Sequence, residues 1–307
     1  MQMRLDDVVI AVLGGDDREL ILIPELRKLG AIIRTAGIPV LTGMEGVTCF
    51  DTVKEAVTGA RFVVLPMFGI DEQGLIRAKY ARKTLILNRE VMAIFPPDAT
   101  IMVGVARPLL KELAAAHGLK LIDMGQRDDV AILNAIPSAE GAIQMAMEAV
   151  PITIHGSRCF VLGFGRTGMT LARMLKGIGA TTYVAARKPA DLARIQEMGF
   201  VPLTFAELPA VIHKADIIFN TVPAIILNED LLKLANPGVY INDLASAPGG
   251  TDFAAAAELG IKAVLAPGLP GIVAPKTAGM ILARVIPRII GEQMALTSST
   301  SPGVNRF

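Results

Sequence analysis

The sequence contains no tryptophan, and aromatic residues make up only 5 % of its 307 residues. Charge is sparse and balanced, because charged residues amount to 19 % and the formal net charge is +1. A chain without an excess of basic residues lacks the field that attracts nucleic acids and anionic membrane surfaces. We therefore expect neither nucleic acid nor a membrane among the partners of this protein.

Cysteine is nearly absent as well, since the chain has only Cys49 and Cys159. Both fall in apolar stretches, so we expect reduced thiols in buried strands and neither a disulfide nor a metal site. No apolar run approaches the roughly 18 residues of a membrane-spanning helix, and the run at residues 8–13 is too short for a signal peptide. These absences predict a cytoplasmic protein.

The chain is rich in small and branched apolar residues, within a hydrophobic content of 52 %. Short apolar runs alternate with helical patterns, as in parallel sheets covered by helices on both faces. The length suggests about two domains. We expect an α/β fold of two doubly wound parallel-sheet domains with a cleft between them. The first would be flavodoxin- or Rossmann-like at residues 1–133, and the second a Rossmann NADP-binding domain at residues 134–290.

Local patterns predict the individual elements. In the first domain we expect strands at residues 8–13, 31–36, 61–65, 84–87, 100–105 and 120–122. Asp51 is the expected N-cap of a helix near residues 51–58, and Ser138 that of a linking helix at residues 138–150. A last helix, from Thr277 to about residue 290, would pack back on the first domain, and residues 291–307 would form a tail.

An apolar run at residues 159–162 is followed by a glycine-rich turn and then by a helical pattern. The turn consists of Gly163, Phe164, Gly165, Arg166, Thr167 and Gly168. This is the G-x-G-x-x-G fingerprint in the strand–turn–helix context that dinucleotide binding requires. Its glycines allow the tight turn, the approach of a pyrophosphate and close helix–strand packing, and the helix N-terminus offers free N–H groups. The alternative is a Rossmann-type turn that has lost its ligand.

The next strand, at residues 181–186, ends in Arg187 and Lys188 rather than in an acid. NAD enzymes usually carry Asp or Glu here for the ribose hydroxyls, whereas a guanidinium can hold a 2′-phosphate. We therefore predict NADP over NAD. The alternative is that both side chains are ordinary solvated loop residues.

The remaining cofactor contacts are expected at two later strand ends. Thr221, Val222 and Pro223 follow one strand and would border the nicotinamide and its ribose, although a plain proline-stopped strand is an equal alternative. Asp243 ends the next strand and would orient a ribose or the nicotinamide amide, or only cap a loop. Residues 14–17, Gly-Gly-Asp-Asp, lack the fingerprint spacing, and their acids would repel phosphate. We interpret them as a structural turn.

Candidate catalytic residues lie in two Gly/Pro-rich loops. Lys276 is the one cation of the second loop and could hold a substrate carboxylate with the hydroxyls of Ser246 or Thr277, helped by Arg18 or Arg107. The alternative for Lys276 is a solvent-facing side chain. No histidine follows residue 213, so the His–Glu relay of hydroxyacid dehydrogenases cannot form in its usual place. The chemistry then favours a ring that gains aromaticity as it loses hydride.

Several stretches together resemble the family of dipicolinate synthase A-subunits over nearly the whole chain. They are VLGGDDREL at residues 12–20, NAIPSAEG at 134–141, IHGS at 154–157, the fingerprint, LASAPGGTDF at 244–253 and LAPGLPGIVAPKTAG at 265–279. The resemblance implies NADP-dependent oxidation of dihydrodipicolinate to pyridine-2,6-dicarboxylate during endospore formation, in the mother-cell cytoplasm. It also implies a small cyclic dicarboxylate substrate and a flavoprotein-like partner, the dipicolinate synthase B-subunit. It carries over no proven catalytic residue.

Two alternative functions remain open at this point. The chain could be a nucleotide-binding scaffold or regulatory subunit of a flavoprotein partner, which the missing His relay favours. It could also be a D-2-hydroxyacid or alanine-type dehydrogenase, on fold analogy alone. In each case we expect a homo-oligomer.

Overall fold

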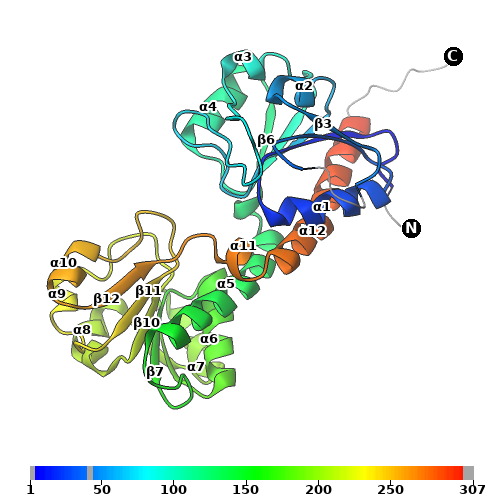
Figure 1. Cartoon of the computed structure of the whole chain (residues 1–307). Coiled ribbons are helices and arrows are strands. Elements are labelled where there is room, and N and C mark those ends of the chain that lie inside the picture. Colours follow the sequence, from blue (N-terminus) through cyan, green and yellow to red (C-terminus); the bar gives the residue numbers. More distant parts are fainter. Residues whose placement is uncertain (1–3, 40–43, 300–307) are drawn as a thin grey trace. The chain divides into compact units, whose positions relative to one another are not determined.

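The computed structural model describes residues 4–39 and 44–299. It consists of two compact units, which we treat separately (Figure 1). Unit 1 comprises the described residues up to Ala131 together with those from Pro275 onward, and unit 2 comprises Ile132–Ala274. The boundary therefore falls inside one long helix, α5 (Asp128–Ala149).

Unit 1 is built on a sheet of six parallel strands in the order β3-β2-β1-β4-β5-β6. The strands are β1 (Val9–Leu13), β2 (Ile32–Ala36), β3 (Val47–Phe50), β4 (Phe62–Val64), β5 (Thr100–Val103) and β6 (Lys120–Asp123). The order 3-2-1-4-5-6 is that of the Rossmann fold rather than of the flavodoxin fold. This settles which of the two expected topologies the first domain has.

The helices of unit 1 are α1 (Asp17–Lys28), α2 (Val53–Val57), α3 (Arg89–Met92), α4 (Pro108–Ala116), the short 3₁₀ helix η1 (Met124–Gln126) and α12 (Pro275–Ser299). Although α12 comes last in the chain, it lies alongside α1 (Figure 1). Gly279 makes this approach possible, because a Cβ there would lie 2.6 Å from Ile21 Cβ and 2.8 Å from the Arg18 carbonyl oxygen.

Unit 2 repeats the same sheet, with six parallel strands in the order β12-β11-β10-β7-β8-β9. The strands are β7 (Arg158–Leu162), β8 (Thr181–Ala185), β9 (Val201–Leu203), β10 (Ile217–Asn220), β11 (Tyr240–Asp243) and β12 (Lys262–Leu265). Besides most of α5, the helices are α6 (Arg166–Ile178), α7 (Pro189–Glu197), η2 (Phe205–Glu207), α8 (Leu208–Val211), η3 (Ile212–Lys214), α9 (Glu229–Leu232), α10 (Phe253–Glu258) and α11 (Leu269–Val273).

Both faces of the unit 2 sheet are buried, as its continuous apolar strands predict. Along β7, Cys159 and Val161 belong to one hydrophobic cluster, and Phe160 and Leu162 belong to another. A strand that alternates between two cores has no polar face, which is why the pattern reads as an unbroken apolar run. The fold class expected from the sequence, two doubly wound parallel sheets, is confirmed.

Several local expectations are wrong. Residues 84–87 form no sheet strand, because their alternation reflects Leu85 and Leu87 in the core and only Ile86 makes an isolated bridge, to Leu75. The edge strand β3 was not expected, and it pairs only with β2. Cys49 lies on this strand and is exposed, not buried.

Three helix ends also differ from the sequence prediction. The N-cap of α2 is Thr52, not Asp51, because Thr52 and Glu55 form a capping box. Ser138 caps no helix, since it lies inside α5 and its hydroxyl donates to the Asn134 carbonyl oxygen. The expected tail begins too early, because α12 continues to Ser299, and residues 300–307 lie outside the described residues.

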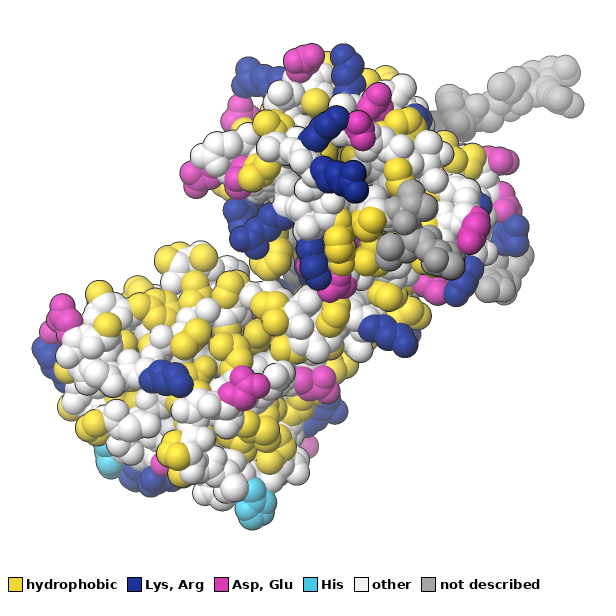
Figure 2. All heavy atoms as spheres, viewed as in Figure 1, with side chains coloured by type: hydrophobic (Ala, Val, Ile, Leu, Met, Phe, Trp, Pro, Cys, Tyr) yellow, Lys and Arg dark blue, Asp and Glu magenta, His cyan; other side chains and the backbone are white. Residues whose placement is uncertain are grey.

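The charge distribution on the surface and the apolarity of the helices relate to the expectation that the protein binds neither nucleic acid nor a membrane. On the face seen in Figure 2, Lys and Arg side chains are interspersed with Asp and Glu rather than gathered into one basic area. Within residues 4–39 and 44–299, no helix combines the length and the apolarity that spanning a bilayer requires.

Candidate nucleotide site

The glycine turn between β7 and α6 has the geometry that a pyrophosphate requires. Gly163 has a φ of +100°, and a Cβ there would lie 2.5 Å from Thr221 Oγ1. A Cβ on Gly168 would lie 2.1 Å from the Gly163 carbonyl oxygen, so this glycine allows helix and strand to approach. Above Gly165 there is nothing within 4 Å. The first and third glycines are thus fixed by packing, whereas the second faces open space where a ligand can approach the backbone.

No side chain caps the start of α6. Gly165 is the N-cap and offers no side-chain hydrogen bond. The first turn of a helix leaves free N–H groups that carry partial positive charge. In α6, with its 13 residues and no capping side chain, such a first turn would favour an anion.

A pocket of about 480 Å³ in unit 2 brings the glycine turn together with the two later strand ends. Of the predicted cofactor residues, it is lined by Gly163, Phe164, Gly165, Arg166, Thr167, Arg187, Lys188, Thr221, Val222 and Pro223. Gly168 lies beneath the turn, where it packs against β7. These residues come from the carboxyl ends of β7, β8 and β10, which is where open α/β sheets bind ligands.

Three further residues line this pocket and were not predicted, namely Ala186, Asp191 and Phe205. Asp191 lies in the first turn of α7, and Phe205 begins η2 just after β9. Only their place in the sequence could have predicted these three residues, since each follows a strand of the unit 2 sheet at its carboxyl end. Asp191 is the one acid among the residues that line the pocket, which also include three cations, Arg166, Arg187 and Lys188.

Asp243 does not lie where the cofactor prediction placed it. Its side chain is fully buried and absent from the pocket lining. One carboxylate oxygen accepts from Asn220 Nδ2 and Ala245 N, both at 3.0 Å, and the other accepts from Gly250 N at 2.8 Å and Thr251 Oγ1 at 2.7 Å. The direct contact is therefore corrected to the alternative, a residue that holds the loop after β11.

Asn220 connects Asp243 to the pocket. Its side-chain amide donates to the Val222 carbonyl oxygen at 3.0 Å and accepts from Val222 N at 3.1 Å. Thr221 is held in turn by its hydroxyl, which donates to the Leu162 carbonyl oxygen at 2.8 Å. The backbone that lines the pocket at residues 221–223 is thus fixed by a buried chain of hydrogen bonds that ends at Asp243.

The predicted catalytic residues belong to different units. Ser246 is exposed in the loop after β11 of unit 2. Lys276 and Thr277 are exposed in the first turn of α12 in unit 1, since this helix begins at Pro275, two residues earlier than expected. Lys276 is therefore a helix residue and not a loop residue.

The corresponding turn of unit 1, between β1 and α1, is filled by the chain itself. Asp16 caps α1 and receives the Arg18 backbone N–H, while Glu19 reaches back to Asp16 N at 2.7 Å. Across the turn, Gly15 N donates to the Arg77 carbonyl oxygen at 2.8 Å. A Cβ on Gly14 would lie 2.6 Å from that same oxygen. Acceptors within the chain thus take the N–H groups of Gly15, Asp16 and Arg18, and the space above the two glycines is filled, in line with the structural turn that the acids predict.

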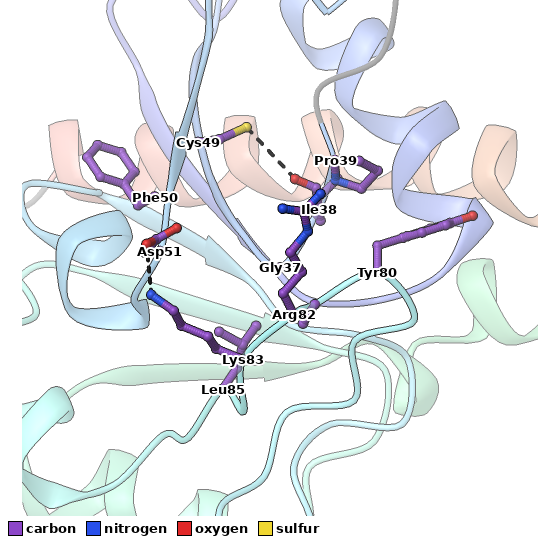
Figure 3. Close-up of a pocket in the computed structure, with 11 residues that line it drawn as sticks. Gly37, Ile38, Pro39, Cys49, Phe50, Asp51, Tyr80, Arg82, Lys83 and Leu85 are labelled. Carbon is purple, nitrogen blue, oxygen red and sulfur yellow. Dashed lines mark hydrogen bonds and ion pairs between the residues drawn. The ribbon is translucent and has the colours of Figure 1, made fainter.

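A second hollow in unit 1, of about 660 Å³, follows β2 and β3 (Figure 3). Lys83 and Asp51 form an ion pair of 2.9 Å in it, which lowers the pKa of the exposed Asp51 carboxyl. Cys49 Sγ lies 3.8 Å from the Ile38 carbonyl oxygen (Figure 3). The hollow lies beside the closed turn, since the hydroxyl of Tyr80, which lines it, donates to Asp17 at the start of α1, but none of the turn residues 14–17 lines it.

Comparison with known proteins agrees with both units. Residues 9–125 match the family model of the N-terminal domain of the dipicolinate synthase A-subunit. Residues 136–248 match the NAD-binding domain of D-isomer-specific 2-hydroxyacid dehydrogenases. Over 292 residues the chain is 41 % identical to the dipicolinate synthase A-subunit of Bacillus subtilis (strain 168), and the match covers 95 % of this chain and 98 % of that protein. This chain belongs to the family of dipicolinate synthase A-subunits.

Solved structures support the assignment to this family. A crystal structure of the dipicolinate synthase A-subunit from Bacillus halodurans has a TM-score of 0.91 at 37 % identity, covering 94 % of this chain and 99 % of that one. An L-alanine dehydrogenase structure reaches a TM-score of 0.62 at 14 % identity over 93 % of this chain and 91 % of that one, which shows the fold alone. The family and its dehydrogenase-type domain support an oxidoreductase with a nicotinamide cofactor.

Proposed function

We propose that this protein oxidises dihydrodipicolinate to dipicolinate with NADP during endospore formation. The observation that carries the proposal is the single pocket in which the glycine turn, Arg187 and Lys188 meet. Membership of the dipicolinate synthase family supports the substrate. The mother-cell cytoplasm and a homo-oligomeric state remain part of the same proposal.

The residues of the pocket fit NADP. The backbone at Gly165 and the start of α6 would bind the pyrophosphate, because no side chain caps the helix and the space above Gly165 is open. Arg187 and Lys188 are exposed at the carboxyl end of β8 and would bind the 2′-phosphate. Thr221, Val222 and Pro223 would border the nicotinamide. When bound, NADP supplies the carbon that accepts a hydride.

The reaction requires little acid–base catalysis from the protein. Dihydrodipicolinate loses a hydride and one proton, and the ring that remains is an aromatic pyridine. Aromatisation drives the loss of the proton, so water can accept it and no His–Glu relay is required. Lys276 and Thr277 of unit 1 and Ser246 of unit 2 are proposed to bind the carboxylates, each with the cation or hydroxyl it exposes.

The experiment that tests this proposal compares NADP⁺ with NAD⁺ as the acceptor, with dihydrodipicolinate as the substrate. We expect NADPH to form with the wild-type chain and the KM for NADP⁺ to rise about 100-fold or more in Arg187→Ala/Lys188→Ala, since two charge-assisted contacts are lost. The KM for NAD⁺ should be unchanged. Arg194→Ala is the matched control, because Arg194 is an exposed arginine of α7 that pairs with Glu197 at 2.8 Å outside the pocket. A wild-type preference for NAD⁺ would contradict the proposal.

A second candidate function is a nucleotide-binding component that needs a flavoprotein-like partner, the dipicolinate synthase B-subunit, for activity. The Bacillus subtilis relative is named as one subunit of its synthase, which favours this candidate, and so does the missing His relay. Assays of this chain with and without the partner distinguish the two candidates. NADPH formation by this chain alone supports the enzyme, whereas activity that appears only with the partner supports the subunit role.

A further inference from the structure

Unit 1 carries a group of basic and aromatic side chains that its closed turn does not explain. In the strand order 3-2-1-4-5-6, β1 and β4 are neighbours, and their carboxyl ends lie at the edge of the sheet where open α/β sheets bind ligands. Arg18 follows β1 at the start of α1, and Phe68 follows β4. A segment that includes Arg77 bridges back to the β1 turn, where Ala78 pairs with Gly15. Three separate segments therefore converge at the carboxyl ends of β1 and β4.

Arg18 is held in one orientation. Its side chain is 3 % exposed, and its Nε and Nη2 donate to the two oxygens of Asp16 at 2.9 Å and 2.8 Å. This leaves Nη1 of Arg18 without a hydrogen-bond partner among the described residues. A buried guanidinium is costly, and one that is fixed by a single carboxylate still has donors for a second.

Phe68 brings a second guanidinium to the same place. The Arg18 Cζ lies 5.9 Å and the Arg77 Cζ 5.0 Å from the centre of the Phe68 ring. Arg77 is exposed and pairs with no carboxylate in the part of the chain that the structure describes. Asp16 is the one acid hydrogen-bonded to this pair, so the cluster of Arg18, Phe68 and Arg77 sets two guanidinium groups against one carboxylate beside an aromatic ring. Glu19 also lies near Arg18, but burial favours the neutral form of its carboxyl.

We propose that this cluster is a subsite of unit 1 that binds a ring carboxylate of the substrate, with Arg18 and Arg77 holding the carboxylate and Phe68 contacting the ring. The inference rests on the cyclic dicarboxylate substrate proposed above. Planar guanidinium groups match carboxylates in charge and geometry, and an aromatic side chain favours a flat ring over a flexible acid. Asp16 is a positioning residue here, since it fixes Arg18.

The test measures the binding of dipicolinate, the stable product, to the full-length chain by calorimetry. Arg77→Gln changes an exposed side chain and should leave the fold intact. Arg18→Lys keeps the buried positive charge but removes the planar guanidinium and its paired N–H donors. We expect each variant to weaken dipicolinate binding about 10- to 100-fold, which is the range for one lost charge-assisted contact. Arg89→Gln is the matched control, because Arg89 is an exposed arginine of unit 1 that pairs with Glu112 at 2.8 Å. NADPH affinity should be the same in all four proteins.

Each outcome decides the inference separately from the proposed function. If dipicolinate binding depends on Arg77 but no dihydrodipicolinate oxidation occurs, the subsite stands and the proposed reaction fails. If oxidation occurs but Arg77→Gln and Arg18→Lys bind dipicolinate as tightly as the wild type, the subsite is wrong and the reaction stands. Failure of the wild-type chain to bind dipicolinate at all would also overturn the subsite.

Discussion

The two units of this protein have the same strand order and the same strand–turn–helix after the first strand, yet their turns differ. In unit 2, Gly165 caps α6 without a side-chain hydrogen bond, and the turn opens on a pocket. In unit 1, Asp16 and Glu19 supply acceptors to the N–H groups of α1, and Arg77 closes the turn from above. A Rossmann sheet therefore does not by itself make a dinucleotide site. The chemistry of the first helical turn decides whether an external anion is needed.

The difference also concerns what each unit can bind. Unit 2 lines its pocket with the glycine turn, the start of α6 and three cationic side chains, a lining that would suit phosphate groups. Unit 1 offers its arginines to a smaller anion, because its backbone donors are already used. The same fold would thus serve the cofactor in one unit and a substrate carboxylate in the other.

The sharpest way to break this comparison is to change the second and third glycines of the fingerprint one at a time. Gly168→Ala should destabilise unit 2 by about 3 kcal/mol or more, because its Cβ would lie 2.1 Å from the Gly163 carbonyl oxygen. Gly165→Ala should change stability by only about 1 kcal/mol, as an N-cap change does, since nothing lies within 4 Å. Gly165→Ala should nevertheless weaken NADPH binding at least as strongly as Gly168→Ala does, because its Cβ would take up the open space that the pyrophosphate needs. Urea unfolding and NADPH titration check both variants, and equal loss of stability in the two would contradict the account.

A second prediction concerns the hydrogen bonds behind the pocket. Asp243→Asn replaces an acceptor with an amide that faces N–H donors at Ala245 and Gly250, so unit 2 should lose about 2–3 kcal/mol. NADPH affinity should fall with it, because Asn220 and residues 221–223 lose their support. Asp123→Asn is the control, since Asp123 ends β6 of unit 1 and accepts from Ala106 N at 3.0 Å and Gly125 N at 3.1 Å. That variant should lose stability but keep NADPH affinity, and a similar loss of affinity would argue against a positioning role for Asp243.

The smallest expected effect lies in the turn of unit 1. Burial raises the pKa of Glu19 to about 7 from an ordinary 4.5, so folding favours its protonated form. Its contribution to stability is therefore complete below pH 4.5 and is lost as the pH rises through about 7. In the wild type, the free energy of unfolding of unit 1 should therefore fall between about pH 5 and pH 8. In Glu19→Gln this fall should be smaller by about 2 kcal/mol.

Amide exchange of α1 at the two pH values measures this difference for unit 1 alone. Glu55→Gln is the control, because Glu55 occupies the same capping-box position in α2 but is exposed. If the wild type and Glu19→Gln lose protection equally with rising pH, then the burial of Glu19 does not set the pH dependence of unit 1.

Much of the fold could be predicted because the relevant signals are local. The buried strands of unit 2 are continuous apolar runs, and the fingerprint specifies a turn whose glycines have separate steric reasons. Residues 14–17 predicted a structural turn because they lack the fingerprint spacing and their acids would repel phosphate, and the structure adds that Asp16 caps α1. The basic pair Arg187 and Lys188 could be placed beside the turn because both follow a strand at the same edge of the sheet.

The features that were missed depend on tertiary contacts. β3 has two exposed central residues and is specified by its pairing with β2, so its sequence carries little apolar pattern. Residues 84–87 were wrongly predicted as a strand, since their buried and exposed residues alternate as in a strand although they cover the core as a loop. Whether Asp243 touches a ligand or holds a loop depends on four donors from other segments, none of which its own strand reveals.

The most direct test of the account measures amide exchange over the whole chain with and without saturating NADPH. We predict protection of residues 163–168 and 187–188 in unit 2, with no change at residues 14–19 of unit 1. Protection of the unit 1 turn, or none at the fingerprint, would contradict the proposal that the glycine turn and the uncapped start of α6 bind the dinucleotide.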